Sequence, residues 1–469
     1  MKNRFVLGLT VFCLFSTFAA ATPQMPAQAV TEELSSAAVA QQTPEQAVFA
    51  GLVSTSALGN SAAGRAALAG NLTVTGAIQN GTMKQPALLN FASQQQQALR
   101  DAFSTYSNLT QLADGLGTAL GAAYQARATQ TDPSHFTAIS PAVTTVIAYA
   151  NHTSGMHSNA AKYFFANATT NGNTPISATS KAILTQAAGT TDVFGKAYKF
   201  PAGSAGAGQF GNARPFQTEP SFTRFSCLDY FGKASSNTSY TRGPGMDLRN
   251  SPSFPSGHTT YGYTSAVLLA ILVPERYPQM IVRGAEYGNN RIVVGAHYAM
   301  DVLGGRTLAL YDMAHLLAND PAYVKTAPSG MQPIEDFPAA VKKARSDVDA
   351  TLTAGCGKTV AECARIDTGR FSNAARDKDF YASTLTYSLP VVFPQNAGKL
   401  EDVAKLAPEA GYLLTAAFPK LTLIEADRIL TETEGPGGGF LDSGSAFGVY
   451  SRLDLYTAGV RATELSASK

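Results

Sequence analysis

Charge is scarce in this sequence of 469 residues. Asp, Glu, Lys and Arg together make up 14% of it, and the formal net charge is +2. A basic balance this weak excludes the broad cationic surface of a typical nucleic-acid-binding protein. The hydrophobic share of 45% excludes a generally disordered chain. Any site for an anion must therefore be local, and it must be built from a few placed side chains.

Apolar runs long enough to cross a membrane are also lacking. At the N-terminus, Lys2 and Arg4 precede an apolar stretch, residues 5–18, and three alanines at 19–21 offer a cleavage site. The stretch is shorter than the ~20 residues that a membrane span needs, and the pattern is that of a secretory signal peptide. We therefore expect removal of residues 1–21 and a mature protein that is periplasmic or secreted, with no membrane span.

Cysteine is rare, with only 4 in the chain. Cys13 lies in the predicted signal peptide and would leave with it. Cys356 and Cys363 are seven positions apart, and such a pair can close a small loop in an oxidising compartment. We predict this disulfide, and we expect the remaining Cys227 to be a buried free thiol.

The rest of the chain divides by composition into three parts. Residues 22–85 are rich in Ala, Gln, Ser, Thr and Gly with little periodicity, and we interpret them as a low-complexity leader that is either weakly ordered or a loose cap on the core. From residue 86 apolar side chains recur at helical spacing, which predicts an all-α fold with a helical-bundle core over 86–321. A mainly helical C-terminal extension of unknown role would follow over 322–469. The predicted helices nearest the candidate motifs are 259–273, 278–287 and 298–317.

Arg291, His297 and Asp301 form one candidate motif. Residues four apart share a face of a helix, so the Asp301 carboxylate can accept the Nδ1–H of His297. That hydrogen bond would fix the tautomer and leave Nε2 as a nucleophile toward phosphorus. An isolated His–Asp pair is more often an ordinary helical contact. A catalytic role for this pair therefore depends on the other two motifs.

A second motif, Pro255-Ser256-Gly257-His258, stands where a predicted helix begins. Gly257 lets backbone N–H groups approach an anion closely, and the N-terminus of a helix favours a phosphate. Ser256 adds a hydroxyl donor, and His258 can give a proton to a leaving oxygen. The alternative is a plain serine N-cap followed by a surface histidine.

Arg214-Pro215, with Lys196 and Lys199 upstream, supplies positive charge. An arginine can clamp two phosphate oxygens and a lysine adds a point charge, although either alone is more often in a surface ion pair. Together the three motifs hold the parts of a phosphate site with covalent and acid catalysis. The sequence has no H-E-x-x-H and no Asp-rich metal loop.

These motifs resemble the signature of the acid phosphatase–vanadium haloperoxidase superfamily, also called the type-2 phosphatidic acid phosphatase superfamily. That signature is K-x6-R-P, then P-S-G-H, then S-R-x5-H-x3-D. The second part is intact, the third has Asn290 where Ser is usual, and residues 283–301 look most like the soluble class A bacterial acid phosphatases. The first part departs from the signature, because Ala207 stands where the lysine is expected. We assign the lysine to Lys196, with Lys199 as the second choice.

The resemblance implies a metal-independent phosphomonoester hydrolase. His297 would form a phosphohistidine with support from Asp301, and His258 would protonate the leaving alcohol and then activate water. The residues that would bind the phosphoryl oxygens are Lys196, Arg214, Ser256, Gly257 and Arg291.

Two other functions fit the same motifs. In a vanadium haloperoxidase, vanadate would fill the same pocket as a cofactor, with His297 as its axial ligand. A secreted binding protein with an inactive site is the third possibility. For the phosphatase, the expected substrate is a phosphorylated small molecule or a lipid phosphate, and we expect no nucleic-acid partner; the sequence leaves the exact substrate and the oligomeric state open.

Overall fold

The computed structural model describes residues 42–83, 86–102, 109–132, 135–186, 189–219, 221–238 and 247–469. The predicted signal peptide and the leader up to residue 41 lie outside the described residues. Thr43–Lys469 pack as one compact, mainly helical unit. The strands of the described residues form two short antiparallel pairs, which are β1 (Gln130–Asp132) with β2 (His135–Phe136) and β3 (Ser226–Leu228) with β4 (Ala234–Ser236). The predicted all-α class is therefore confirmed.

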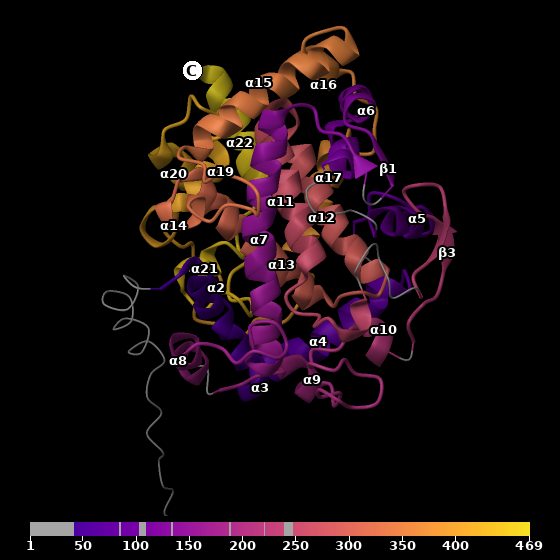
Figure 1. Ribbon diagram of the computed structural model, residues 1–469, viewed down its shortest axis with the longest axis vertical. Helices are drawn as coiled ribbons and strands as arrows, with labels where there is room; N and C mark the ends of the chain where they lie inside the picture. Colours follow the sequence, from indigo (N-terminus) through magenta and orange to yellow (C-terminus); the bar gives the residue numbers. More distant parts are fainter. Residues whose placement is uncertain are drawn as a thin grey trace, which may run out of the picture. The chain divides into compact units, whose positions relative to one another are not determined.

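Four helices form the centre of the unit (Figure 1). Helix α7 (Pro141–Asn167) packs against α11 (Gly257–Leu272) and α13 (Ala299–Leu317), and α11 packs against α12 (Tyr277–Val293). Almost every residue of α11 is buried, and its last seven residues, 266–272, are apolar on all sides, as expected for a helix inside the protein. The three predicted helices correspond to α11, α12 and α13.

The end of one of these helices differs from the prediction in a way that matters for function. Helix α12 continues past residue 287 to Val293, so Arg291 is helical. Gly288 and the two asparagines that follow it are weak helix formers, but burial of this whole stretch overrides their propensity. Helix α13 begins at Ala299, so His297 lies in the turn before the helix.

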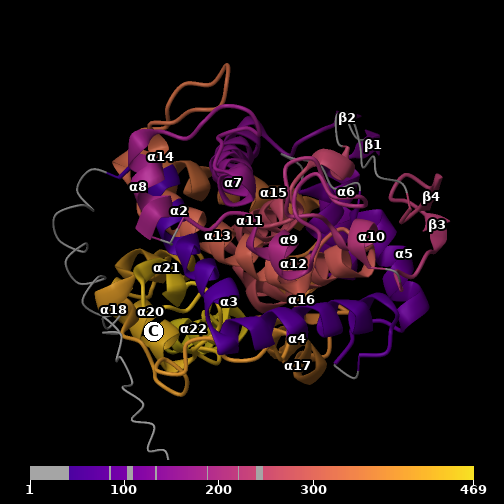
Figure 2. The same ribbon diagram turned by 90° about the horizontal axis from the view of Figure 1, so that it is seen from below.

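The described part of the predicted leader is helical, which corrects the boundary at residue 85. It forms α2 (Pro44–Leu52), α3 (Ala57–Asn60) and α4 (Ala62–Gln79). Thr43 and Ser61 cap α2 and α4 through their side chains. Alanine, which made this segment look like low complexity, is the best helix former. Helix α4 contacts both α12 and α13 (Figure 2).

The C-terminal extension shares the core of the central helices. Helix α15 (Phe337–Cys356) packs against α7, and α22 (Leu455–Ser468) packs against α12. One buried cluster unites Leu268 of α11 with Val348 and Leu413 of the extension. The predicted boundary at 321/322 therefore does not separate two hydrophobic cores.

The other helices of eight or more residues are α5 (Phe91–Asp101), α6 (Thr118–Arg127), α8 (Ala178–Gln186), α17 (Ala374–Thr386) and α20 (Leu423–Glu432). The short ones are α9 (Val193–Ala197), α10 (Pro215–Thr218), α14 (Pro321–Val324), α16 (Val360–Arg365), α18 (Val403–Leu406), α19 (Tyr412–Thr415) and α21 (Ala446–Val449).

The cysteines follow the prediction in their pairing. Cys356, at the end of α15, forms a disulfide with Cys363 of α16. Cys227 is free, but it is half-buried on β3 rather than fully buried. Across the described ranges, none of the helices is both long and apolar enough to span a bilayer.

Candidate active site

The three sequence motifs converge in the interior of the unit. Arg214 comes from the loop before α10, Gly257 and His258 from the first turn of α11, and Arg291 from the end of α12. Nη1 of Arg214 lies 3.0 Å from Nε2 of His297. Each of these residues is buried. The sequence therefore identified most of one shared site.

The backbone around Asp301 corrects the reason for its closeness to His297. Tyr298 is the N-cap of α13, and the Asp301 carboxylate reaches back to accept its N–H at 2.8 Å. The two residues therefore meet across a capping turn and not along one helix face. His297 Nδ1 lies 3.4 Å from Asp301 Oδ2, which is longer than a normal hydrogen bond. The hydroxyl of Ser253 lies near both groups, 3.3 Å from Nδ1 and hydrogen-bonded to Oδ2.

Helix α4 holds the same turn from the other side. Thr75 Oγ1 accepts the N–H of Ala299 at 3.1 Å, and Asn71 Oδ1 accepts that of Met300 at 3.0 Å. These N–H groups belong to the first turn of α13 and have no partner within that helix. Asn71 and Thr75 were not predicted as site residues. The sequence pattern that could have identified them is a pair of polar residues four positions apart in an alanine-rich helix.

The Pro-Ser-Gly-His segment begins α11 as predicted. Ser256 is the N-cap, and its hydroxyl oxygen accepts the N–H of Thr259 at 3.2 Å. The hydroxyl proton is thus available for donation to a ligand. A side chain at Gly257 would put its Cβ 3.5 Å from Nζ of Lys162 and 3.5 Å from Oγ of Ser158. Because Gly257 has no side chain, the space beside Lys162 and Ser158 stays free for a ligand.

Arg291 is the most informative side chain of the site. It is fully buried, and within the described part of the protein none of its three guanidinium nitrogens has a hydrogen-bond partner. Burial lowers its pKa, although Tyr287 and Asp101 act in the opposite direction. A buried guanidinium without partners is costly, because it has lost its water and gained nothing in return. This geometry is typical of a site that is completed by an anion.

The structure corrects the lysine assignment. Lys196 is exposed on α9 and lines a surface cavity of about 500 Å³ beside Arg65, and Lys199 is exposed as well. The lysine at the site is Lys162 of α7, which is only 7% exposed and donates from Nζ to the carbonyl of Pro252 at 3.2 Å. Burial and the charges of Arg214 and Arg291 lower its pKa well below the usual value.

The spacing explains why Lys162 was missed. Between Lys162 and Arg214 lie 51 residues, against six in the signature, so the motif contains an insertion of 45 residues. A search at fixed spacing finds Ala207 and then the nearest lysines along the chain. Only the fold shows that α7 brings Lys162 back to Arg214.

Electrostatics at the site favour an anion and a neutral imidazole. Burial lowers the pKa of His297 well below its usual value, and Arg214, Lys162, Arg291 and His258 lower it further. Burial raises the pKa of Asp301 to about 6, against the effect of its hydrogen bonds and of nearby cations. Two arginines and a lysine whose pKa is lowered therefore lie near one carboxylate and a neutral histidine, and Nε2 of this histidine faces Arg214. Among the described residues, no group of three or more His, Cys, Asp or Glu is placed to hold a metal ion.

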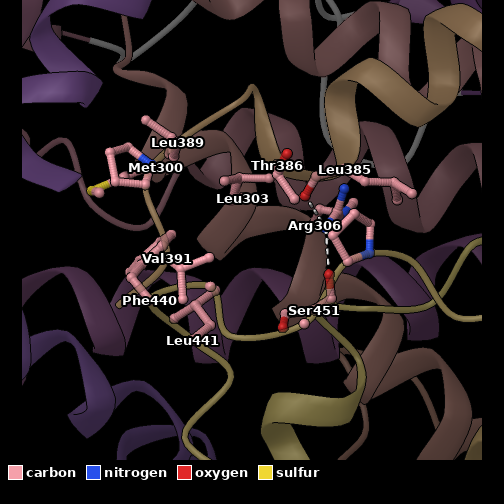
Figure 3. A pocket seen from close by; sticks show the side chains of 14 residues that line it. Met300, Leu303, Arg306, Leu385, Thr386, Leu389, Val391, Phe440, Leu441 and Ser451 are labelled. Atoms are coloured by element: carbon pink, nitrogen blue, oxygen red, sulfur yellow. Dashed lines mark hydrogen bonds between the residues drawn. The ribbon is translucent and has the colours of Figure 1, made fainter. Parts of the chain in front are cut away.

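A second feature of α13 is a cavity of about 110 Å³, shown in Figure 3. Met300, Leu303 and Arg306 line it from α13, and Arg306 donates to the carbonyl of Ser451 at 2.7 Å. None of the residues of the candidate site lines this cavity. The helix thus serves the site through Asp301 and packs against the C-terminal extension through Arg306.

Comparisons with known proteins agree with the geometry. Residues 206–318 match the family model of the PAP2 superfamily. The chain is 37% identical over 89 residues to a non-specific acid phosphatase of Salmonella typhimurium, which is 19% of this chain and 35% of the relative. It is 44% identical over 64 residues to an acid phosphatase of Zymomonas mobilis (14% and 24%), and 32% identical over 122 residues to a non-specific acid phosphatase of Providencia stuartii (26% and 46%).

The matched part of the chain thus spans less than half the length of each of these relatives. The family-model match over residues 206–318 includes Arg214, the Pro-Ser-Gly-His segment, and the stretch from Arg291 to Asp301. Lys162 of α7 and the capping residues of α4 reach the site from outside it. The part of the chain that holds most of the candidate site, residues 206–318, is thus similar to the PAP2 superfamily.

Proposed function

We propose that the protein is a phosphomonoester hydrolase that acts on a phosphorylated small molecule or a lipid phosphate. The observation that carries this proposal is the buried, unpartnered guanidinium of Arg291 next to a neutral His297. A tetrahedral oxyanion satisfies such a guanidinium and lies within reach of the imidazole. The names of the three relatives, all acid phosphatases, support the same chemistry.

In the first step, Arg214, Arg291 and Lys162 would bind the phosphoryl oxygens, with the backbone and hydroxyl donors at Ser256 and Gly257. Nε2 of His297 attacks phosphorus, so that a P–N bond forms while the P–O bond to the leaving group breaks. His258 gives its proton to the leaving oxygen. The cations stabilise the charge on the equatorial oxygens in the transition state.

In the second step, His258 would take a proton from water, and the water oxygen attacks the phosphohistidine. The P–N bond breaks and inorganic phosphate leaves. Asp301 stabilises the positive charge that His297 carries while it is phosphorylated. Because protein cations supply all of this stabilisation, the proposed reaction needs no metal ion.

The direct test of this function is hydrolysis of p-nitrophenyl phosphate by the purified protein in excess EDTA. We expect turnover to survive the chelator. The same cations would hold vanadate, so oxidation of bromide by peroxide with vanadate is measured in parallel. Bromide oxidation without phosphatase turnover would replace the proposal by a haloperoxidase, and neither activity would indicate a binding protein.

The corrected lysine assignment gives a sharp comparison of variants. Lys162→Ala is expected to lower kcat/KM by about 10²-fold, because it removes a contact to the phosphoryl group in the transition state. Lys196→Ala and Lys199→Ala are matched controls on the exposed surface and should change kcat/KM by less than about threefold. A larger loss of kcat/KM in either control than in Lys162→Ala would assign the phosphate-binding role to that lysine instead.

Export is also part of the proposal. The disulfide between Cys356 and Cys363 supports it, because such bonds persist in oxidising compartments. Recovery of active protein that retains Met1 from the cytoplasm would contradict it.

A further inference from the structure

Ser253 lies on the loop between Asn250 and α11, and nothing in the motif pattern assigned it a role. It is buried, and its backbone N–H donates to the carbonyl of Asn212 at 2.7 Å. This anchor fixes the serine beside the turn that carries His297. Its hydroxyl lies 3.3 Å from Nδ1 of His297 and donates to Oδ2 of Asp301.

The direction of these hydrogen bonds follows from counting protons. An ionised carboxylate only accepts, so the single hydroxyl proton of Ser253 must go to Asp301. The serine oxygen can then only accept from the imidazole. Nδ1 of His297 must therefore carry the proton, and Nε2 must carry the lone pair.

We infer that Ser253 is a positioning residue that links Asp301 to His297 and holds the imidazole in the tautomer with its proton on Nδ1. For its effect on catalysis, this inference rests on the proposed function. Asp301 is too far from Nδ1, at 3.4 Å, to form a good direct hydrogen bond. Ser253 touches neither the reacting phosphorus nor the attacking nitrogen, so it acts through His297.

Arg214 also favours this tautomer when no ligand is bound, because its Nη1 lies 3.0 Å from Nε2 and can only donate. A bound phosphate competes for that guanidinium and offers its own oxygens as acceptors of a proton on Nε2. The contribution of Ser253 is therefore largest in the liganded protein, which is the state in which Nε2 has to attack.

The experiment compares Ser253→Ala with the wild type in two measurements. The first is the tautomer of His297, read from 15N chemical shifts that are assigned with His297→Ala. At about pH 8 a histidine with a lowered pKa is neutral, so the two tautomers are distinguished cleanly. The wild type should keep its proton on Nδ1 with and without inorganic phosphate, and Ser253→Ala should move toward Nε2–H when phosphate is added.

The second measurement is turnover. Ser253→Ala should lower kcat by about 10–100-fold, as is usual for partners that orient a reacting side chain, and should leave the inhibition constant of phosphate within about threefold. Ser253→Thr keeps the hydroxyl and should recover most of the rate. Ser154→Ala removes another buried serine hydroxyl, which bonds within α7 and to Thr264, and it serves as the matched control for packing.

The inference is overturned if Ser253→Ala keeps its proton on Nδ1 in the presence of phosphate. It is also overturned if Ser154→Ala loses as much kcat as Ser253→Ala. A wild type without any phosphatase turnover would contradict the proposed function, and the tautomer measurement would still decide the role of Ser253.

Discussion

Replacing His297 with alanine is expected to lower kcat by about 10⁴-fold or more, because the reaction would lose the atom that attacks phosphorus. The anion site should remain, since Arg214, Arg291 and Lys162 are unchanged. Vanadate or phosphate should therefore still raise the melting temperature of the variant. Steady-state hydrolysis and a thermal shift with phosphate measure both quantities on one sample. A loss of less than about tenfold would contradict the assignment.

His258→Ala is the matched variant at the other histidine and should behave differently. Its proton serves the leaving group, so the loss depends on how much help that group needs. We expect a loss of about 10²–10⁴-fold with an alkyl phosphate and a much smaller loss with p-nitrophenyl phosphate. Equal losses with both substrates would remove His258 from the role of general acid.

Arg291→Met is expected to abolish most activity and, at the same time, to stabilise the ligand-free protein. The guanidinium is buried without hydrogen-bond partners, so its replacement by an apolar side chain removes a desolvated charge. We expect kcat/KM to fall by about 10²–10³-fold and the free energy of unfolding to rise by at least about 1 kcal/mol. Stabilisation by phosphate should disappear in the variant.

Arg283 of the same helix is the natural control. It is also fully buried, but it is paired with Asp101 at 2.6 Å, Asp114 at 2.7 Å and Glu286 at 3.2 Å. Although burial opposes its charge, these carboxylates raise its pKa well above the usual value. Arg283→Met would remove the cation paired with Asp101 and leave Asp114 and Glu286 with Arg370 alone, and it should cost about 3–5 kcal/mol. Denaturant unfolding of both variants measures the two effects, and a change of the same sign in both would contradict the account.

The sequence predicted those site residues that lie in short continuous motifs. Gly257 and His258 belong to one helix start, and Arg291 lies six positions before His297, so local spacing was enough. The closeness of His297 and Asp301 was also predicted, although a capping turn and not a shared helix face brings them together. Ser253 was missed because its role depends on where a loop folds, which no local pattern encodes.

Other parts could not be predicted because insertions and composition hid them. Lys162 is separated from Arg214 by the long insertion, and only the packing of α7 restores their proximity. Helix α4 was concealed by an alanine-rich composition that is typical of both leaders and helices. The role of Asn71 and Thr75 is visible only in the folded protein, where both accept N–H groups of the first turn of α13.

The C-terminal extension illustrates the same limit. Its residues show no motif, yet Arg370 bonds Glu286 of α12 at 2.9 Å, and a second nitrogen of its guanidinium reaches Asp114 at 2.6 Å. These carboxylates also bind Arg283, so the extension closes a buried charge network on the helix that carries Arg291. Such contacts join residues far apart in the sequence, and they are invisible until the chain is folded.

If His297 attacks phosphorus, the enzyme passes through a phosphohistidine, and mapping the labelled residue of the phosphoenzyme shows whether it does. Wild-type protein is mixed with a substrate labelled in its phosphoryl group, quenched rapidly, and digested for identification of the labelled residue. We expect an adduct on His297 that is labile in acid and stable in base, and that is absent from His297→Ala. An adduct on Ser256 or on any other residue, or normal turnover with no adduct at all, would contradict it.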